Sequence, residues 1–129
     1  MKQELKDKKM FSVKRLINSF KYAGEGIKTS VLREQNLVIH MFFLVMVLIF
    51  SIVFKISRYE FLIVIVVSGL VISLEMVNTA IENTVDINKK YSIEAKRAKD
   101  AASGAVLVSA IIAIIVGLTI FLPKIIALF

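Results

Sequence analysis

Three long apolar stretches dominate the pattern of the chain, and none of them contains Asp, Glu, Lys or Arg. They are residues 35–54, 61–74 and 101–123. A helix rises about 1.5 Å per residue, so roughly 20 residues cross the hydrocarbon core of a membrane. The first and third stretches are long enough, whereas the second crosses only if its helix continues past Glu75. The pattern therefore predicts three membrane spans, at about 35–54, 61–85 and 101–122.

Residues 11–33 carry a different pattern, in which apolar residues recur at helical spacing and basic residues occupy the opposite face. Val13, Ile17 and Phe20 belong to the apolar face, and Lys14 faces away from it. A basic amphipathic helix of this kind is typical of a segment that lies in the membrane interface, attracted by anionic headgroups. Packing of the apolar face against the protein itself would give the same pattern. Either way, we expect a surface helix beside the membrane.

Composition is consistent with one membrane domain. Of the 129 residues, 57% are hydrophobic and 21% are charged. A soluble domain of this size could not bury so large an apolar fraction. The three spans leave little of the chain for a folded module outside the membrane. We therefore expect residues 1–129 to form a single all-α integral membrane domain.

The basic residues indicate the side of the membrane that each loop faces. The chain has 17 Lys and Arg against 10 Asp and Glu. Nine of the basic residues precede the first span and five lie between Asp86 and Ala102, whereas two lie in the first turn and one is Lys124. The positive-inside rule then predicts a multi-pass plasma membrane protein with a cytoplasmic N-terminus and an external C-terminus. Because topology accounts for the basic excess, we expect no nucleic-acid partner.

Small residues recur every four positions in the third span, at Ala105, Ser109, Ala113 and Gly117. Such spacing lets helix backbones approach closely, which is how membrane helices associate. Three helices also offer little interior in which to shield polar groups. We therefore expect the chain to associate with copies of itself.

The second span carries a polar stripe at its C-terminal end. Glu75, Asn78, Glu82 and Asp86 fall at about 0°, 300°, 340° and 20° around a helix, so they share one narrow face. An ionisable group at membrane depth costs at least about 2.5 kcal/mol, and such groups usually have a function. The alternative is a helix that emerges into water early and carries its acids on a solvated face.

Acids that share a face repel one another unless a positive charge lies among them, and the sequence offers two candidates, a divalent cation and the cluster at residues 96–100 just before the third span. The chain has no Cys and one His, so a metal would have to be a hard cation such as Mg²⁺, bound by carboxylates and phosphate oxygens. Glu34, just before the first span, could supply a further acid, and Lys99 could meet phosphate charge. Alternatively, Lys99 is an ordinary basic flank of a membrane span. The chain lacks the P-loop and the G-x-G-x-x-G motif.

Two motifs resemble the signature of the small prokaryotic diacylglycerol kinase family. They are Glu75-x-x-Asn78-Thr-Ala-Ile-Glu82-x-x-Val-Asp86 and Ala95-Lys96-x-Ala98-Lys99-Asp100-x-x-Ser103-x-Ala105-Val106. The resemblance extends from about Arg15 to Lys124. Within the family, the segments 78–84 and 117–124 resemble those of the Gram-positive branch, whose members are undecaprenol kinases.

This resemblance implies a homotrimer of three-span subunits with active sites shared between neighbours, and phosphoryl transfer from MgATP to a lipid hydroxyl. It also implies the roles of individual residues. Glu75 matches the general base of the family, and Glu34 and Glu82 match its metal ligands. Lys99 and Asp100 match the pair that contacts the nucleotide, and Arg15 and Tyr22 match surface-helix residues that contact it. Asn78 and Ser103 match polar positions near the substrate. The loop at 87–94 departs from the family pattern.

The resemblance therefore favours an integral-membrane lipid kinase that phosphorylates undecaprenol to undecaprenyl phosphate, with diacylglycerol as the alternative substrate. Two other classes of function remain open from the residues alone. The intramembrane acids could form a proton or cation relay in a small oligomeric transporter, although nothing polar continues into the outer half of any span. The third possibility is a purely structural subunit of a larger complex. It would not explain why Glu75 and Glu82 place acidic side chains at membrane depth.

Overall fold

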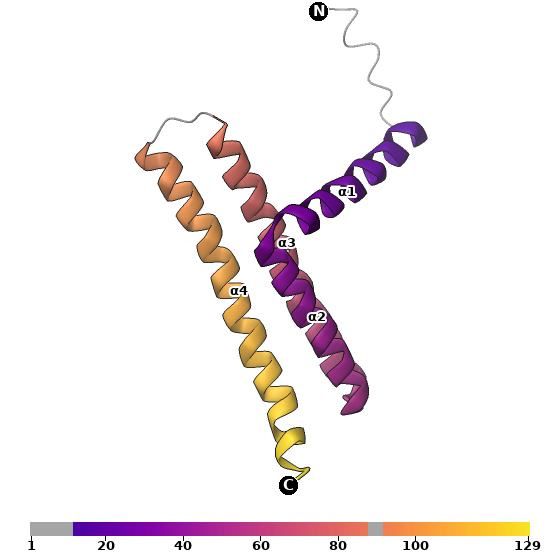
Figure 1. The fold of residues 1–129 in the computed structure, drawn as a ribbon. Coiled ribbons are helices and arrows are strands. Elements are labelled where there is room, and N and C mark those ends of the chain that lie inside the picture. The colour runs from indigo at the N-terminus through magenta and orange to yellow at the C-terminus, as the bar shows by residue number, and fades with distance from the viewer. Residues whose placement is uncertain (1–11, 88–91) are drawn as a thin grey trace, which may run out of the picture.

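The computed structural model describes residues 12–87 and 92–129, and these form four helices. They are α1 (Val13–Arg33), α2 (Gln35–Val53), α3 (Arg58–Asp86) and α4 (Ile93–Ile126). In Figure 1, α2, α3 and α4 run up and down as a bundle, and α1 leaves the start of α2 at a steep angle. The all-helical prediction is confirmed for the described residues. Residue 11, where the surface helix was predicted to begin, and residues 88–91 of the second loop lie outside them.

Three of these helices, α2, α3 and α4, are long and apolar enough to cross a membrane. The continuation of α3 past Glu75 is confirmed, since the helix ends at Asp86. Two helices begin earlier than the predicted spans, α3 at Arg58 and α4 at Ile93. The predicted starts of these spans were set at the beginning of an uncharged stretch. A helix can begin before that stretch, because charged residues are compatible with helix outside the membrane.

Side-chain caps set these early starts. Ser57 and Glu60 form a reciprocal capping box at the start of α3, and the Ser92 Oγ accepts a hydrogen bond from the Ala95 N–H at 3.0 Å at the start of α4. Each cap satisfies backbone N–H groups that have no partner within the helix. The connection before α3 turns at Lys55, whose φ of 47° lies in the left-handed region.

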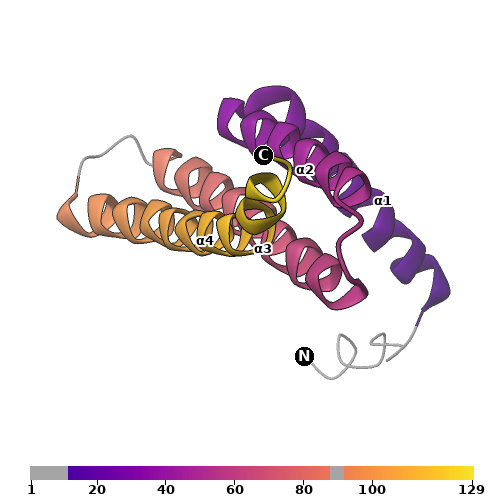
Figure 2. The same cartoon turned by 90° about the horizontal axis from the view of Figure 1, so that it is seen from below.

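Packing is closest between α3 and α4, which run antiparallel, and α2 packs on α3 (Figures 1 and 2). The buried cluster lies toward the end of the bundle opposite α1 and consists of Val64, Ile120 and Phe121. The Phe121 ring meets those of Phe50 and Phe54 at centroid distances of 6.1 and 6.2 Å. Contacts at these separations favour tilted aromatic pairs. They join α4 to the end of α2.

Two ion pairs connect α3 with α4, one at each end of the bundle. At the end nearer α1, the Lys99 Nζ lies 2.9 Å from a carboxylate oxygen of Asp86. At the opposite end, the Lys124 Nζ lies 3.0 Å from Glu60. The polar contacts between these two helices therefore lie outside the apolar middle of the bundle.

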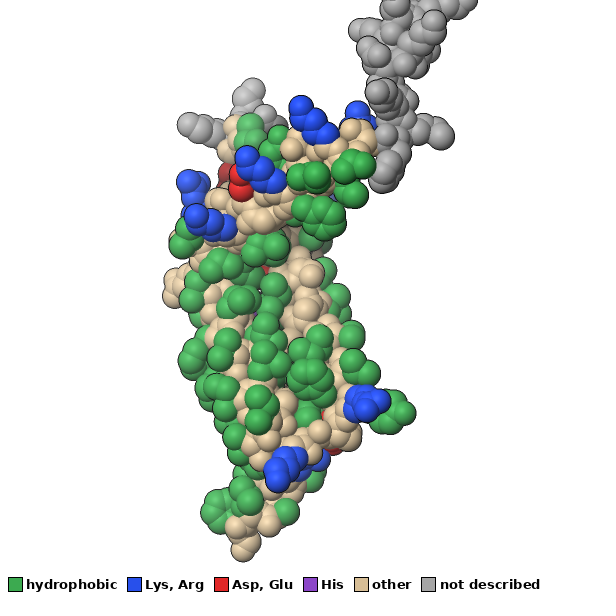
Figure 3. Space-filling model, turned by 90° about the vertical axis from the view of Figure 1, so that its right-hand side faces the viewer, with side chains coloured by type: hydrophobic (Ala, Val, Ile, Leu, Met, Phe, Trp, Pro, Cys, Tyr) green, Lys and Arg blue, Asp and Glu red, His purple; other side chains and the backbone are tan. Residues whose placement is uncertain are grey.

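Large apolar side chains cover most of the outer surface of the bundle. Figure 3 shows hydrophobic side chains in a broad band, with the basic side chains gathered above and below it. Phe42, Val66 and Ile114 are each at least 60% exposed within this band. In water such a surface would associate or aggregate. The charge-free band instead matches the surface that a membrane helix presents to lipid or to another helix.

Candidate active site

The polar stripe on α3 becomes more exposed toward the end of the helix. Glu75 and Asn78 are buried, at 3% and 6% exposure, Glu82 is half-buried, and the Asp86 side chain is 65% exposed. The stripe is therefore not a solvated face along its whole length, because its first two members are covered by the protein. Burial of polar groups is costly unless they are paired, so these positions need a reason beyond helix formation.

Asn78 links the buried part of the stripe to Glu82. Its Nδ2 donates a hydrogen bond to the Glu82 Oε1 at 3.1 Å. Its Oδ1 is buried and has no hydrogen-bond partner among the described residues. An orphaned buried acceptor is uncommon in proteins and usually indicates a missing partner. The amide therefore fixes one oxygen of Glu82 and offers an acceptor of its own.

Lys99 brings a positive charge to the exposed end of the stripe. Its Nζ donates to both carboxylate oxygens of Asp86, at 2.9 and 3.2 Å, across the gap between α3 and α4. The hydrogen bond to Asp86 and, to a smaller extent, the charge of Glu82 raise the pKa of the Lys99 ammonium. The sequence offered Lys99 as one candidate for a positive charge among the acids, and the fold places it on Asp86 of the neighbouring helix.

Asp100 and Ser103 make their contacts within α4. Asp100 pairs with Lys96 one turn earlier at 2.7 Å, with both side chains about 60% exposed. The Ser103 Oγ donates to the Asp100 carbonyl oxygen at 3.1 Å. Neither side chain forms a hydrogen bond or ion pair with α3 in the described parts of the chain. Both lie on the same stretch of α4 as Lys99.

Glu34 is the single residue between α1 and α2. Its backbone N–H donates to the Ser30 carbonyl at 2.9 Å, and its own carbonyl accepts from the Val38 N–H at 3.2 Å. Its side chain forms no capping hydrogen bond, so the carboxylate is not used to end or start a helix. The residue is half-buried. Among the described residues, the Glu34 carboxylate forms no hydrogen bond or ion pair.

The donor set suits a magnesium ion that arrives with phosphate. No three His, Cys, Asp or Glu side chains within residues 12–87 and 92–129 lie close enough to hold a metal alone. Mg²⁺ usually takes one or two protein carboxylates and completes its shell with water and substrate phosphate. Glu82 fits this chemistry because Asn78 engages only one of its two oxygens.

Arg15 and Tyr22 lie on α1 and are exposed, Tyr22 by 65%. Among the described residues, neither side chain is hydrogen-bonded or ion-paired to the α3 stripe. The exposed apolar residues of α1 include Val13, Ile17 and Phe20, and α1 contains no buried residue. The other described residues therefore leave this helix largely uncovered.

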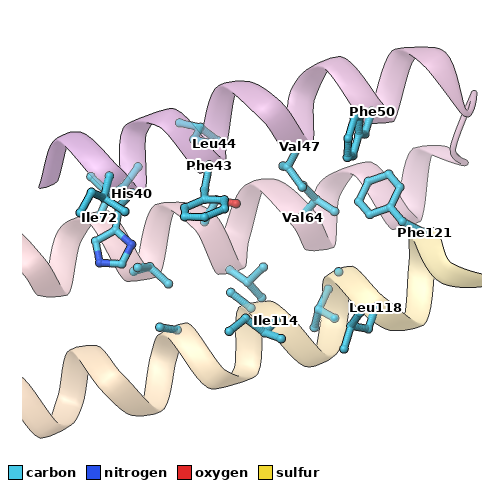
Figure 4. A pocket seen from close by; sticks show the side chains of 18 of the residues that line it. His40, Phe43, Leu44, Val47, Phe50, Val64, Ile72, Ile114, Leu118 and Phe121 are labelled. Atoms are coloured by element: carbon cyan, nitrogen blue, oxygen red, sulfur yellow. The ribbon is translucent and has the colours of Figure 1, made fainter. Parts of the chain in front are cut away.

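An apolar cavity of about 530 Å³ lies between α2, α3 and α4. Figure 4 shows His40 and Ile72 at one end, Phe50 and Phe121 at the other, and Phe43 between them. Ile72 lies one turn before Glu75, so the cavity begins beside the buried part of the stripe. Sequence reasoning missed this cavity, because its lining comes from three helices whose mutual placement no local pattern encodes.

Comparison with known proteins gives a match to one family model and matches to two individual proteins, and all three are undecaprenol or diacylglycerol kinases. The family model for prokaryotic diacylglycerol kinase matches residues 21–121. An undecaprenol kinase from Bacillus subtilis is 46% identical over 111 residues, which cover 85% of this chain and 90% of that protein. A diacylglycerol kinase from a Synechocystis species is 37% identical over 115 residues, covering 88% of this chain and 66% of that protein.

Proposed function

The chain belongs to the prokaryotic diacylglycerol kinase family, and on that premise we propose that it is an integral-membrane lipid kinase acting on undecaprenol. The reaction transfers the γ-phosphoryl group of MgATP to the lipid hydroxyl and gives undecaprenyl phosphate. One observation carries the choice of substrate: the similarity to the Bacillus undecaprenol kinase extends over 90% of that protein.

Diacylglycerol is the alternative acceptor, because a relative at 37% identity is a diacylglycerol kinase. The apolar cavity beside Glu75 supports a lipid acceptor in both cases. Its lining does not separate a polyprenyl chain from acyl chains, since both are apolar. The choice between the two substrates therefore depends on the difference in similarity.

Glu75 is proposed as the general base. Its burial places a carboxylate within the bundle, one helical turn after Ile72, which lines the apolar cavity. The carboxylate takes the hydroxyl proton as the lipid oxygen attacks the γ-phosphorus, and the bond to the β-phosphate oxygen breaks to release ADP. Asn78, whose buried Oδ1 has no partner among the described residues, and Ser103 are the other proposed substrate contacts.

The nucleotide is proposed to bind at the exposed end of the stripe. Glu34 and Glu82 would hold Mg²⁺, which neutralises phosphate charge as the β–γ bond breaks. Lys99 contacts the phosphates, and Asp100 belongs to the same nucleotide-binding set. Arg15 and Tyr22 of α1 complete it. Positioning and charge neutralisation account for most of the catalysis in phosphoryl transfer, and this set of side chains provides both.

The proposed assembly is a homotrimer in the plasma membrane, with the N-terminus and the α3–α4 loop in the cytoplasm and the C-terminus outside. The distribution of basic residues supports this orientation. In the trimer, α1 lies as an amphipathic helix on the membrane surface. Its exposed apolar residues support this placement, since no other part of residues 12–87 and 92–129 covers them.

The test is transfer of labelled γ-phosphate from MgATP to undecaprenol and, separately, to diacylglycerol, with the purified protein in nanodiscs. We expect stronger labelling of undecaprenol. Glu75→Gln keeps the size of the side chain and removes the base, so turnover should fall at least about 100-fold. Size-exclusion chromatography should show the same oligomer for both proteins.

Each result has a distinct consequence. Preferential labelling of diacylglycerol would replace undecaprenol as the substrate. Wild-type turnover by Glu75→Gln would remove Glu75 as the base. Labelling of neither lipid by a folded oligomer would contradict the lipid kinase proposal and favour an ion or proton transporter.

A further inference from the structure

The two ion pairs described between α3 and α4 differ in whether a structural role accounts for the acidic residue. Glu60 has two structural roles, because one of its oxygens accepts the Ser57 N–H at 2.7 Å and the other accepts Lys124 at 3.0 Å. Asp86 caps nothing: within the described residues, both of its oxygens accept hydrogen bonds from Lys99 alone. Its position needs another explanation.

Stability is a poor explanation for the Asp86 pair. The side chains of Asp86 and Lys99 are 65% and 35% exposed, so water screens their attraction. Exposed ion pairs contribute little to the free energy of folding, because the Coulomb gain is offset by the entropy of fixing two side chains. The pair of Glu60 with Lys124 is more covered, with both side chains 30% exposed. It is the better candidate for a structural bond.

The place of the Asp86 pair is informative. Asp86 follows Glu82 by one helical turn on the same face of α3. The pair therefore holds a flexible lysine one helical turn from the carboxylate that is proposed to bind magnesium. A lysine ammonium has three N–H donors. Lys99 can keep a bond to Asp86 and still donate to a phosphate oxygen.

We propose that Asp86 is a positioning residue for the nucleotide, which acts by holding the Lys99 Nζ one helical turn from Glu82 before the phosphates of MgATP arrive. The inference rests on the proposed kinase function and extends it to a residue with no assigned role. Lysine is a flexible side chain with high rotamer entropy. Fixing it in advance lowers the entropy that nucleotide binding must otherwise remove.

The first test compares Asp86→Asn with Glu60→Gln in the full chain. Both changes remove one carboxylate charge from an α3–α4 ion pair and keep the size of the side chain. Asp86→Asn should raise the KM for MgATP about two- to tenfold, with the KM for the lipid unchanged. Glu60→Gln should leave the KM for MgATP unchanged and lower the thermal stability. Asp86→Glu, which restores the charge, should recover most of the affinity for MgATP.

The second test is a double-mutant cycle read by binding of a fluorescent ATP analogue with Mg²⁺. Because Asp86 acts through Lys99, Asp86→Asn should weaken binding in the wild-type background and have no effect in a Lys99→Met background. This measurement does not need a turning-over enzyme. It therefore remains informative if Lys99→Met is inactive.

Three results would overturn the inference while leaving the kinase proposal intact. They are a wild-type KM for MgATP in Asp86→Asn, an equal rise in Glu60→Gln, and additive effects of the two substitutions on analogue binding. Absence of phosphoryl transfer by the wild-type protein would instead refute the proposed function. The two failures are thus distinguishable.

Discussion

At the residue scale, the α3 stripe combines side chains in very different surroundings. Glu75 and Asn78 are buried, and Asp86 is in contact with solvent, although all of them lie on one face of one helix. A buried acid and an exposed acid have different uses, because only the exposed one meets a soluble nucleotide directly. The gradient of exposure separates the proposed lipid end of the site from the proposed nucleotide end.

Asn78→Ala should raise the Mg²⁺ concentration that the enzyme needs for turnover. The substitution removes the hydrogen bond that holds the Glu82 Oε1, and loss of a partner that orients a metal ligand costs roughly 10- to 100-fold in metal affinity. The measurement is the Mg²⁺ concentration that gives half-maximal turnover at saturating lipid. Thr84→Ala is the control, because Thr84 bonds only to the backbone of its own helix in the described structure. An unchanged Mg²⁺ requirement in Asn78→Ala would contradict this role.

At the element scale, the starts of α3 and α4 follow from caps more than from hydrophobicity. α4 begins at Ile93, and its first turns carry Lys96 and Lys99 outside the apolar stretch. The sequence showed where a helix could enter the membrane. It did not show how far the same helix extends beyond the membrane, because polar residues are compatible with both helix and loop.

Ser92→Ala should destabilise the start of α4. The Ser92 Oγ accepts the Ala95 N–H at 3.0 Å, and removal of such a cap costs about 1 kcal/mol. The expected result is a lower free energy of unfolding and faster amide exchange in the first turn of α4. Ser19→Ala is a matched control, because the Ser19 hydroxyl bonds to a carbonyl inside α1 and caps no helix end. Equal exchange rates in the wild-type protein and Ser92→Ala would show that the cap is dispensable.

At the scale of the whole molecule, one copy of the chain leaves most of its apolar surface uncovered. The bundle has few buried residues, and many large apolar side chains in α2, α3 and α4 are exposed. Lipid and further copies of the chain are the two environments that can cover such a surface. The same exposed surface therefore supports both the proposed membrane location and the association of copies of the chain.

Chelation of metal should abolish turnover without unfolding the protein. A structural metal site needs a closed set of ligands, and the described residues hold no cluster of three candidate side chains. EDTA should therefore remove phosphoryl transfer, added Mg²⁺ should restore it, and the unfolding temperature in nanodiscs should stay the same. The control is EDTA already saturated with Mg²⁺. A lower unfolding temperature after chelation would indicate a structural metal.

The sequence alone determined the number of long apolar helices, the presence of a separate N-terminal helix and the polar stripe of α3. These features depend on local periodicity and on the cost of placing charge in a membrane, which single segments encode. Only the tertiary structure decided that Asp86 meets Lys99, that Asn78 is buried with a free acceptor, and that three helices enclose an apolar cavity. Such contacts depend on how helices far apart in sequence rotate and pack, and no local pattern specifies that.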